Sequence, residues 1–467
     1  MHADLSRINF RPERGYSAVV AQQGRVQLDS DANEQALIQL HEQRTVLTDL
    51  IGPHGGPVDA TGFGIERIAG PHGLSDLAIG GGRYYVGGIR CDAYRPTPGE
   101  AVPDEDEPVP PVEQPSSWTY WDQPDGFRDP ELPADRLPDE PYLVYLKVWE
   151  RIVTAAEDPQ LREVALGAAA PDTSARVKVV WQVLALPAAD LGVTNADAPA
   201  DAVREAFEEW NRLQRARPPL LAARSKRPAD ADTDPCLVHP EARYRGPENQ
   251  LYRVEIHEGG AESGATFKWS RENGSVVFPI DEVDGTWVAL ASLGGDEKLD
   301  LDVGDLVEVV DTAYASRLEP DPLLRVEELD LPERRVRLSA EPEAGRDARL
   351  HPFLRRWDQR EGSRQPGAPT RPMRGGAIPV EEGRWLRLED GVEVHFKRTD
   401  PGRPAYRTGD HWLIPARTAT GDVEWPTDAG SRPLLREPTG IFVQYAPLAW
   451  VAGEQQIVDL RLTFGLT

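Results

Sequence analysis

The stretch YLVYLKVWERIV (142–153) decides the fold class of this chain. It is rich in aromatic and β-branched residues and contains neither glycine nor proline, which favours a β-strand. Shorter runs of the same kind recur between turn-forming residues, and several alternate apolar and polar positions. They are RVKVVWQVLAL (176–186), LYRVEIHEG (251–259), SVVFPI (275–280), TWVALAS (286–292), DLVEVVD (305–311) and RVRLSA (335–340). The sequence therefore predicts a mainly β protein.

Helices are a minority in this pattern. Residues 31–51 carry leucines and an isoleucine at intervals of three, four and seven, and Pro53 ends the segment. Residues 199–216 place Val203, Phe207, Trp210 and Leu213 on one helical face. Both spacings predict an amphipathic helix with a structural role.

Length and punctuation predict several folding units. A chain of 467 residues has room for about two to four units of ~100–200 residues. Prolines and glycines, 43 and 41 of them, separate β-sandwich or barrel-like modules, and the long Pro-rich, acidic segment 96–141 cannot hold a regular sheet ladder. A second loop-like stretch covers 341–379. We expect an N-terminal arm and helix (1–60), a β domain with the 96–141 loop (61–190), a helix plus β domain (191–320) and a C-terminal β domain (321–467).

The net charge of −26 limits the classes of partner that this chain is expected to bind. Nucleic-acid affinity comes largely from Lys and Arg displacing counterions, so neither DNA nor RNA is expected as a partner. No run of ~18 apolar residues predicts a membrane span, and the first residues lack the apolar core of a signal peptide. We expect synthesis and assembly in the cytoplasm, with release in an extracellular particle left open. For Cys91 and Cys236 we expect two buried thiols, and a single disulfide stays open.

The stretch VQLDSDANEQALIQLHEQ (26–43) resembles two metal motifs and satisfies neither. A calcium loop counted from Asp29 needs glycine sixth and glutamate twelfth, where the chain has Glu34 and Leu40. A zinc-protease helix needs a second histidine four residues after His41, where Thr45 stands. Asp31 and Glu34 instead have capping-box spacing, and Asp29 adds charge near the positive end of the helix dipole.

We therefore interpret Asp29, Asp31, Asn33 and Glu34 as a structural helix cap. Metal binding and a polar contact with a partner protein stay open as alternatives for this stretch. No other motif nominates a catalytic, cofactor-binding or metal-binding residue. His257-Glu258 lacks a second histidine, GGGRYYVGG (80–88) leads into strand formers, and no G-x-S-x-G elbow occurs. The sequence predicts no enzyme.

Two aromatic stretches need separate interpretations. In FKWSRENGSVV (267–277), Phe267 and Trp269 share one face of a strand, which favours core, and Asn273-Gly274 signals a hairpin turn. In WTYWDQPDGF (118–127), Trp118, Tyr120 and Trp121 interrupt the acidic loop and indicate a segment held on a surface. Exposed rings of this kind bind sugars, so a carbohydrate- or surface-binding role is the alternative for these three residues.

Several long motifs together resemble one uncharacterised bacterial domain family. They include VVAQQGRVQLDSDANEQ, GGRYYVGGIRCD, FKWSRENGSVV and YRTGDHWLIPARTATGDVEWP, and the resemblance covers nearly the whole chain. Members are often encoded beside phage-tail-like contractile injection systems. Where the family motif usually reads Asp-Ala-Asp-Trp-Asn-Glu, this chain has Ser30 and Ala32.

The resemblance implies a structural or interaction component of such a particle, in its baseplate, spike, cage or fibre region. It implies other particle subunits as partners and a homo-oligomer, with a trimer or hexamer as natural symmetries, and no cofactor. The alternative functions are a carbohydrate- or cell-surface-binding module and, third, a glycan or cell-wall hydrolase. Partner contacts are expected along 96–141 and 1–25.

Overall fold

The computed structural model describes residues 2–96, 117–167, 170–193, 195–216, 219–226, 243–294, 299–360, 373–399, 406–453 and 456–465. The chain forms two compact units, each assembled from three separate segments. Unit 1 comprises Met1–Leu37, Arg151–Lys178 and Arg217–Ile441, and unit 2 comprises Ile38–Glu150, Val179–Ala216 and Phe442–Thr467. The linear boundaries expected at 60, 190 and 320 do not coincide with these units, because the chain passes between them several times. Most of the expected 96–141 loop lies outside the described residues.

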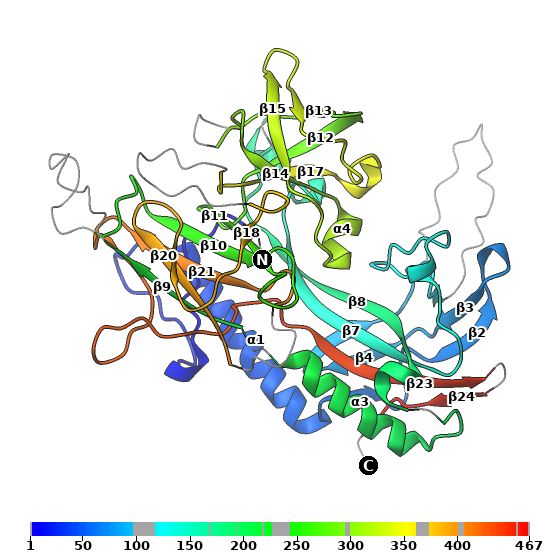
Figure 1. Cartoon of the computed structure of the whole chain (residues 1–467). Coiled ribbons are helices and arrows are strands. Elements are labelled where there is room, and N and C mark those ends of the chain that lie inside the picture. Colours follow the sequence, from blue (N-terminus) through cyan, green and yellow to red (C-terminus); the bar gives the residue numbers. More distant parts are fainter. Residues whose placement is uncertain are drawn as a thin grey trace. The chain divides into compact units, whose positions relative to one another are not determined.

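A five-stranded sheet is the first of three β structures in the described part of unit 1 (Figure 1). Its β10 and β11 pair antiparallel, with Glu255 opposite Lys268 and Val254 opposite Trp269. One face of this sheet carries buried apolar side chains, among them Tyr252, Val254 and Phe267. In order across the sheet, the strands are β18 (Ile378–Pro379), β11 (Thr266–Ser270), β10 (Gln250–Ile256), β21 (His411–Arg417) and β22 (Asp422–Val423).

A closed barrel of six strands is the second β structure of unit 1, and Figure 1 draws it in green and yellow. In β14 all five residues are buried, and so are all five of β17. Its own apolar core includes Val288, Val307 and Leu354. The strands are β12 (Val277–Asp284), β13 (Trp287–Leu290), β16 (Arg335–Leu338), β15 (Leu324–Asp330), β14 (Leu306–Val310) and β17 (Phe353–Trp357).

A three-stranded sheet completes the β structure of unit 1. Its middle strand β20 pairs over its whole length with β9, and Phe396 and Leu221 face each other across that pair. Both residues belong to the same apolar core as the five-stranded sheet. The strands are β19 (Trp385–Arg387), β20 (Val392–Arg398) and β9 (Pro219–Ser225).

Unit 2 contains three smaller sheets. Its core gathers apolar residues from all of them, including Leu77, Tyr84 and Leu146. The first has β25 (Thr463–Phe464), β1 (His54–Pro57), β4 (Arg83–Val86) and β5 (Ile89–Asp92). The second has β24 (Gln456–Asp459), β23 (Gln444–Gly453), β7 (Tyr142–Val153) and β8 (Arg176–Pro187). The third has β2 (Ile65–Ala69), β3 (Ser75–Ile79) and β6 (Trp118–Thr119).

The described α-helices are α1 (Asp29–Ile51), α2 (Ala188–Leu191), α3 (Ala200–Arg215) and α4 (Thr312–Arg317). Helix α3 buries Val203 and Phe207 fully, as its apolar spacing predicts. Helix α1 is less amphipathic in the structure than the sequence predicts. Ser30 and Ile38 are its buried residues, whereas Val46 and Leu50 are 55 and 78% exposed. Its apolar side chains are therefore only partly covered by this chain.

The prediction of a mainly β fold with a few helices is confirmed. Strand β7 begins and ends at the residues of the quoted stretch, and GGGRYYVGG (80–88) forms β4 and the turn of the β4–β5 hairpin, not a phosphate loop. The interpretation of 341–379 as a loop is wrong, because β17 and β18 lie within it.

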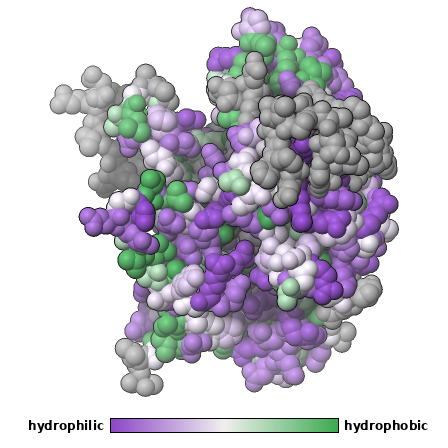
Figure 2. Space-filling view, turned by 90° about the vertical axis from the view of Figure 1, so that its left-hand side faces the viewer, coloured by the Kyte–Doolittle hydropathy of each residue, from purple (hydrophilic) through white to green (hydrophobic). Residues whose placement is uncertain are grey.

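Figure 2 shows mostly hydrophilic residues on the face that it presents, as the charge predicts. In the part of the chain that is described, no helix is long and apolar enough to cross a membrane.

Candidate functional site

The first residues of the chain are held in a polar socket of unit 1. Ala3 is 5% exposed, and its carbonyl accepts a hydrogen bond of 2.8 Å from the Asn273 side-chain amide. The His2 ring lies 3.1 Å from the Glu255 carboxylate, from Nε2 to Oε2, and packs edge-on against Trp357. Asn273 and Gly274 have φ of 53° and 65°, the left-handed turn conformation that Asn-Gly favours. The turn positions the Asn273 amide to receive Ala3.

Behind this socket lies a cluster of five buried charged side chains. Arg253 and Glu255 project from β10, Lys268 from β11, Glu308 from β14 and Arg355 from β17, each less than 10% exposed. Strand register pairs them, since Glu255 faces Lys268 and Glu308 faces Arg355 across neighbouring strands. The cluster therefore joins the charged face of the five-stranded sheet to two strands of the barrel.

Lys268 is the centre of this charged cluster. Its Nζ lies 2.6 Å from Glu308 Oε1, 3.4 Å from Glu255 Oε1 and 4.3 Å from the centroid of the Trp357 ring. Glu308 also accepts hydrogen bonds from the Tyr314 hydroxyl at 2.6 Å and from Trp357 Nε1 at 3.0 Å. Arg253 donates to Glu255 from Nε at 2.6 Å. Every carboxylate in the cluster thus has cationic and neutral donors, which offsets the cost of its burial.

The electrostatics of the charged cluster keep its carboxylates ionised. Burial alone would raise the pKa of Glu255, but Arg253 and Lys268 outweigh it and hold that pKa well below its ordinary value. The pKa of Glu308 is lowered in the same way, by Lys268 and Arg355 against the effect of burial. Burial, together with Arg253 and Arg355, lowers the pKa of His2 far enough to keep its ring neutral at pH 7. The cluster is thus a set of buried ion pairs that joins β10 and β11 to β14 and β17.

A clamp closes the next segment of the chain. Asp29, the first residue of α1, accepts two hydrogen bonds from Ser6, from its backbone N–H at 2.9 Å and its hydroxyl at 2.6 Å. The same serine offers its carbonyl to Arg417 Nη2 at 2.9 Å, which ties the clamp to β21. These hydrogen bonds lower the pKa of Asp29 despite its partial burial. The Ser6–Asp29 clamp therefore fixes both ends of residues 7–28 at one place.

Inside this closed segment lies an exposed stretch that we call the arm, residues 14–28. All of its residues are exposed except Val19, whose N–H donates to Gln35 Oε1 of α1 at 2.7 Å. Its apolar side chains Tyr16, Val20, Val26 and Leu28 are 60, 80, 83 and 47% exposed. Just before the arm, Glu13 lies 3.6 Å from Arg436, from Oε1 to Nη2. Figure 1 shows the arm in dark blue, leading into α1.

The remaining predicted cap residues lie in the first turns of α1. The helix begins two residues before the start expected at residue 31, so Asp31 is its third residue and not its cap. The Asp31 carboxylate still reaches back, accepting a 3.4 Å hydrogen bond from the N–H of Leu28. Asn33 and Glu34 are half-buried on the following turn. The structure brings Asp29 and Asp31 to the base of the arm, where their partners are Ser6 and Leu28.

The three predicted surface aromatics of unit 2 have partners of their own. Tyr120 is 2% exposed, so its ring cannot serve as a binding surface, and its hydroxyl donates to the Asp135 carbonyl at 3.1 Å. Trp121 donates from Nε1 to the Ser75 carbonyl at 3.1 Å, and Arg95 stacks over Trp118 at 4.4 Å from its centroid. The two tryptophans are half-buried against the core of unit 2. This packing gives the aromatic residues of the loop a structural role in unit 2.

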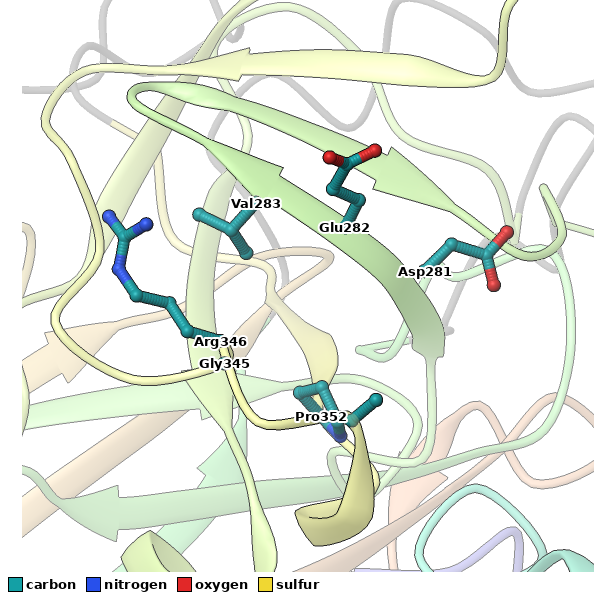
Figure 3. Close-up of a pocket in the computed structure, with 7 residues that line it drawn as sticks. Asp281, Glu282, Val283, Gly345, Arg346 and Pro352 are labelled. Atoms are coloured by element: carbon teal, nitrogen blue, oxygen red, sulfur yellow. The ribbon is translucent and has the colours of Figure 1, made fainter.

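A hollow of about 340 Å³ lies on the barrel and was not expected from the sequence. Figure 3 shows the side chains of Asp281 and Glu282 on β12 pointing in different directions. Arg346 pairs with Glu341. Among the residues that line the hollow there is no histidine, cysteine or hydroxyl group, and its carboxylates do not converge. The residues are Asp281, Glu282, Val283, Gly345, Arg346, Ala348 and Pro352.

The described residues support neither a metal site nor a reactive thiol. Over the described ranges, no group of three or more His, Cys, Asp or Glu side chains is placed to hold a metal ion. Cys91 is a free, buried thiol whose pKa is raised by burial, which keeps it protonated and unreactive. Cys236 lies outside the described residues.

Sequence reasoning missed the charged cluster and the Ser6–Asp29 clamp. Arg253, Glu308 and Arg355 stand in strands where a charged residue is ordinarily expected to face solvent. The one local signal is the FLRRW run at 353–357, in which two arginines lie between apolar residues of a strand. Ser6 lies 23 residues from Asp29, and nothing in the spacing links them.

The protein is mainly β, and its described residues form a buried ionic cluster and an exposed apolar arm. A model for a family of unknown function (DUF6519) matches residues 1–215 and 188–442, so the chain belongs to that family. No curated protein and no solved structure matches the chain.

Proposed function

We propose that this protein is a structural and interaction component of a phage-tail-like contractile injection particle, in its baseplate, spike, cage or fibre region. The observation that carries the interaction role is the arm. It is clamped at its base by Ser6 and Asp29, yet its apolar side chains are exposed along its length. The particle itself is inferred from the motifs that this chain has in common with proteins encoded beside such systems.

The exposed apolar side chains of the arm and its fixed ends both favour binding of a partner. Exposed apolar residues scattered singly are ordinary, but a group of them in one short segment marks an interaction site. The Ser6–Asp29 clamp fixes both ends of residues 7–28 and so restricts the conformations of the arm, which reduces the entropy lost when a partner docks. Glu255 of the charged cluster and the Asn273 amide support the same role, because they bind His2 and Ala3 and so hold the start of the segment in place.

The experiment is a tagged version of this protein expressed in a cell that assembles the particle. We expect sheath and tube subunits to co-purify with it, and deletion of the protein to leave particles lacking density near the baseplate. Particles of unchanged composition and shape after the deletion would contradict the proposal. Val20→Asp with Val26→Asp in the arm should reduce this co-purification, whereas Val164→Asp, at a valine that is 78% exposed outside the arm, serves as the control.

A further inference from the structure

The arm stands out among the exposed apolar residues of unit 1. Four of the ten large apolar side chains exposed in the described part of that unit fall within residues 16–28. The other six are spread over the remaining described residues of the unit. They are Val164, Leu166, Val177, Val303, Leu331 and Leu434. The arm therefore carries more exposed large apolar side chains than any other described stretch of that length in unit 1.

The backbone of the arm is also available for pairing. Within the described ranges, residues 16–27 take part in no β-ladder or isolated bridge. Their one hydrogen bond within the backbone closes a turn, from the N–H of Arg25 to the carbonyl of Gln22 at 3.3 Å, with Gly24 at φ 70°. Beyond that turn and the Val19 N–H, which donates to Gln35, the backbone groups of residues 16–27 are suited to pair with a strand edge of another chain, and apolar residues alternate at Tyr16, Ala18 and Val20.

The charge of the arm identifies the kind of partner. Residues 14–28 contain two arginines, Arg14 and Arg25, and no acidic residue. The segment contributes +2 to a chain of net charge −26, so the remaining residues together carry −28. A basic, apolar arm on an acidic protein is complementary in charge to the acidic surface of another copy of that protein.

We propose that the arm docks on a second copy of this chain, with Val20 and Val26 as apolar anchors and Arg14 and Arg25 facing acidic side chains of that copy. In this contact the arm of one copy covers a surface outside the arm of the other, an arrangement that a two-fold pair and a closed ring both satisfy. This inference rests on the proposed interaction role and names its partner.

Sedimentation velocity over a series of protein concentrations tests the proposal directly. The wild-type chain is expected to self-associate, and Val20→Asp with Val26→Asp to weaken association at least about tenfold, because a charge replaces each anchor. Val164→Asp, at an equally exposed valine outside the arm, should associate like the wild type. A wild-type chain that stays monomeric throughout, or an arm variant that associates like the wild type, would overturn the proposal.

Mixing two chains tests whether the arm contacts a surface outside the arm. A tagged chain in which a Gly-Ser linker replaces residues 14–27 keeps the acidic surface and loses the arm. It should capture the intact chain but not a second armless chain. Capture between two armless chains would show that association runs through another surface, and would contradict the proposal.

The role of the two arm arginines in association is tested against a control pair of arginines. Arg14→Gln with Arg25→Gln should weaken association, whereas Arg349→Gln with Arg432→Gln removes the same charge from side chains that are 89 and 83% exposed outside the arm. Equal effects of the two pairs would refute a specific role for the arm arginines. Self-association in a protein absent from every particle would refute the proposed function alone. A monomeric protein found in particles would refute this inference alone.

Discussion

Lys268 shows how a buried charge can be accommodated at the scale of one residue. It is 3% exposed and lies between two carboxylates and the face of Trp357. Taking an ammonium group from water is costly, and this cost is offset only if the partners are close and well oriented. Removing the lysine would leave Glu255 and Glu308 with fewer cations than their burial requires.

We therefore predict that Lys268→Met destabilises unit 1 by about 3–5 kcal/mol, the usual cost of removing one partner of a buried ion pair. Urea denaturation followed by tryptophan fluorescence measures the change. The control is Arg335→Met, because Arg335 pairs with Asp330 at 3.2 Å while both remain partly exposed, at 48 and 31%. Its loss should cost less than about 1 kcal/mol. Equal costs for the two variants would mean that the buried pairs contribute no more than exposed ones.

His257 makes the stability of unit 1 depend on pH. It is 4% exposed, and burial, followed by the nearby Lys268, lowers its pKa from 6.5 to about 4. Between these two values the unfolded chain binds a proton that the folded chain excludes, so stability falls as the pH falls.

The variant His257→Gln should remove this contribution, which reaches about 3 kcal/mol near pH 4. Free energies of unfolding at pH 7 and pH 4 for both proteins give the difference without assuming that the variant is otherwise neutral. If the loss of stability between these pH values is the same with and without His257, the histidine is not responsible for it.

Element by element, most of the secondary structure could be predicted, but not which strands pair. The apolar runs at 142–153 and 176–186 define β7 and β8 because side-chain type and spacing are local properties. The Asn273-Gly274 turn has the predicted positive φ angles, yet it joins no hairpin. β11 before it belongs to the five-stranded sheet and β12 after it to the barrel.

The same distinction explains what was missed at the candidate site. Asp29 could be placed at a helix start from local charge, but its partner Ser6 depends on how the chain returns to that place. The FLRRW strand was hidden by two arginines, one of which, Arg355, faces Glu308 on a strand far away in sequence. Long-range pairing of polar groups leaves no periodic signal, so it cannot be derived from one sequence.

The Asn273-Gly274 turn also provides a prediction at the scale of single elements. A Cβ on Gly274 would lie 2.8 Å from His2 Cδ2, whereas a Cβ on Gly285, in the β12–β13 turn, would meet nothing within 4 Å. Both glycines have positive φ, 65° and 57°, so both changes to alanine carry the same backbone strain of about 1–2 kcal/mol. Gly274→Ala should cost about 1–2 kcal/mol more, because it also displaces His2 from Glu255.

Chemical denaturation of the two variants measures this difference, and a His2→Ala background supplies the control. Without the imidazole the two glycine substitutions should become equivalent. An excess cost for Gly274→Ala that persists in that background would show that His2 is not the group displaced.

For the molecule as a whole, the division into two units predicts two unfolding events. Phe267 belongs to the apolar core of unit 1 and Phe207 to a core of unit 2, and both are fully buried. Phe→Ala at either site should cost about 3–5 kcal/mol. In scanning calorimetry we expect two transitions, with Phe267→Ala lowering one and Phe207→Ala lowering the other, because each unit has its own core. A single transition lowered by both substitutions would contradict this.

The interleaved connectivity of unit 2 has a consequence for synthesis on the ribosome. Strand β7 pairs along Tyr142–Val148 with β23, which comes some 300 residues later in the chain. The nascent polypeptide therefore holds an apolar strand edge without its neighbour while all of 217–441 is being translated. An unpaired edge of this kind invites wrong pairing with other chains. Chaperone binding to β7 during translation, and aggregation when residues from 442 onward are cut away, are what such an order of assembly entails.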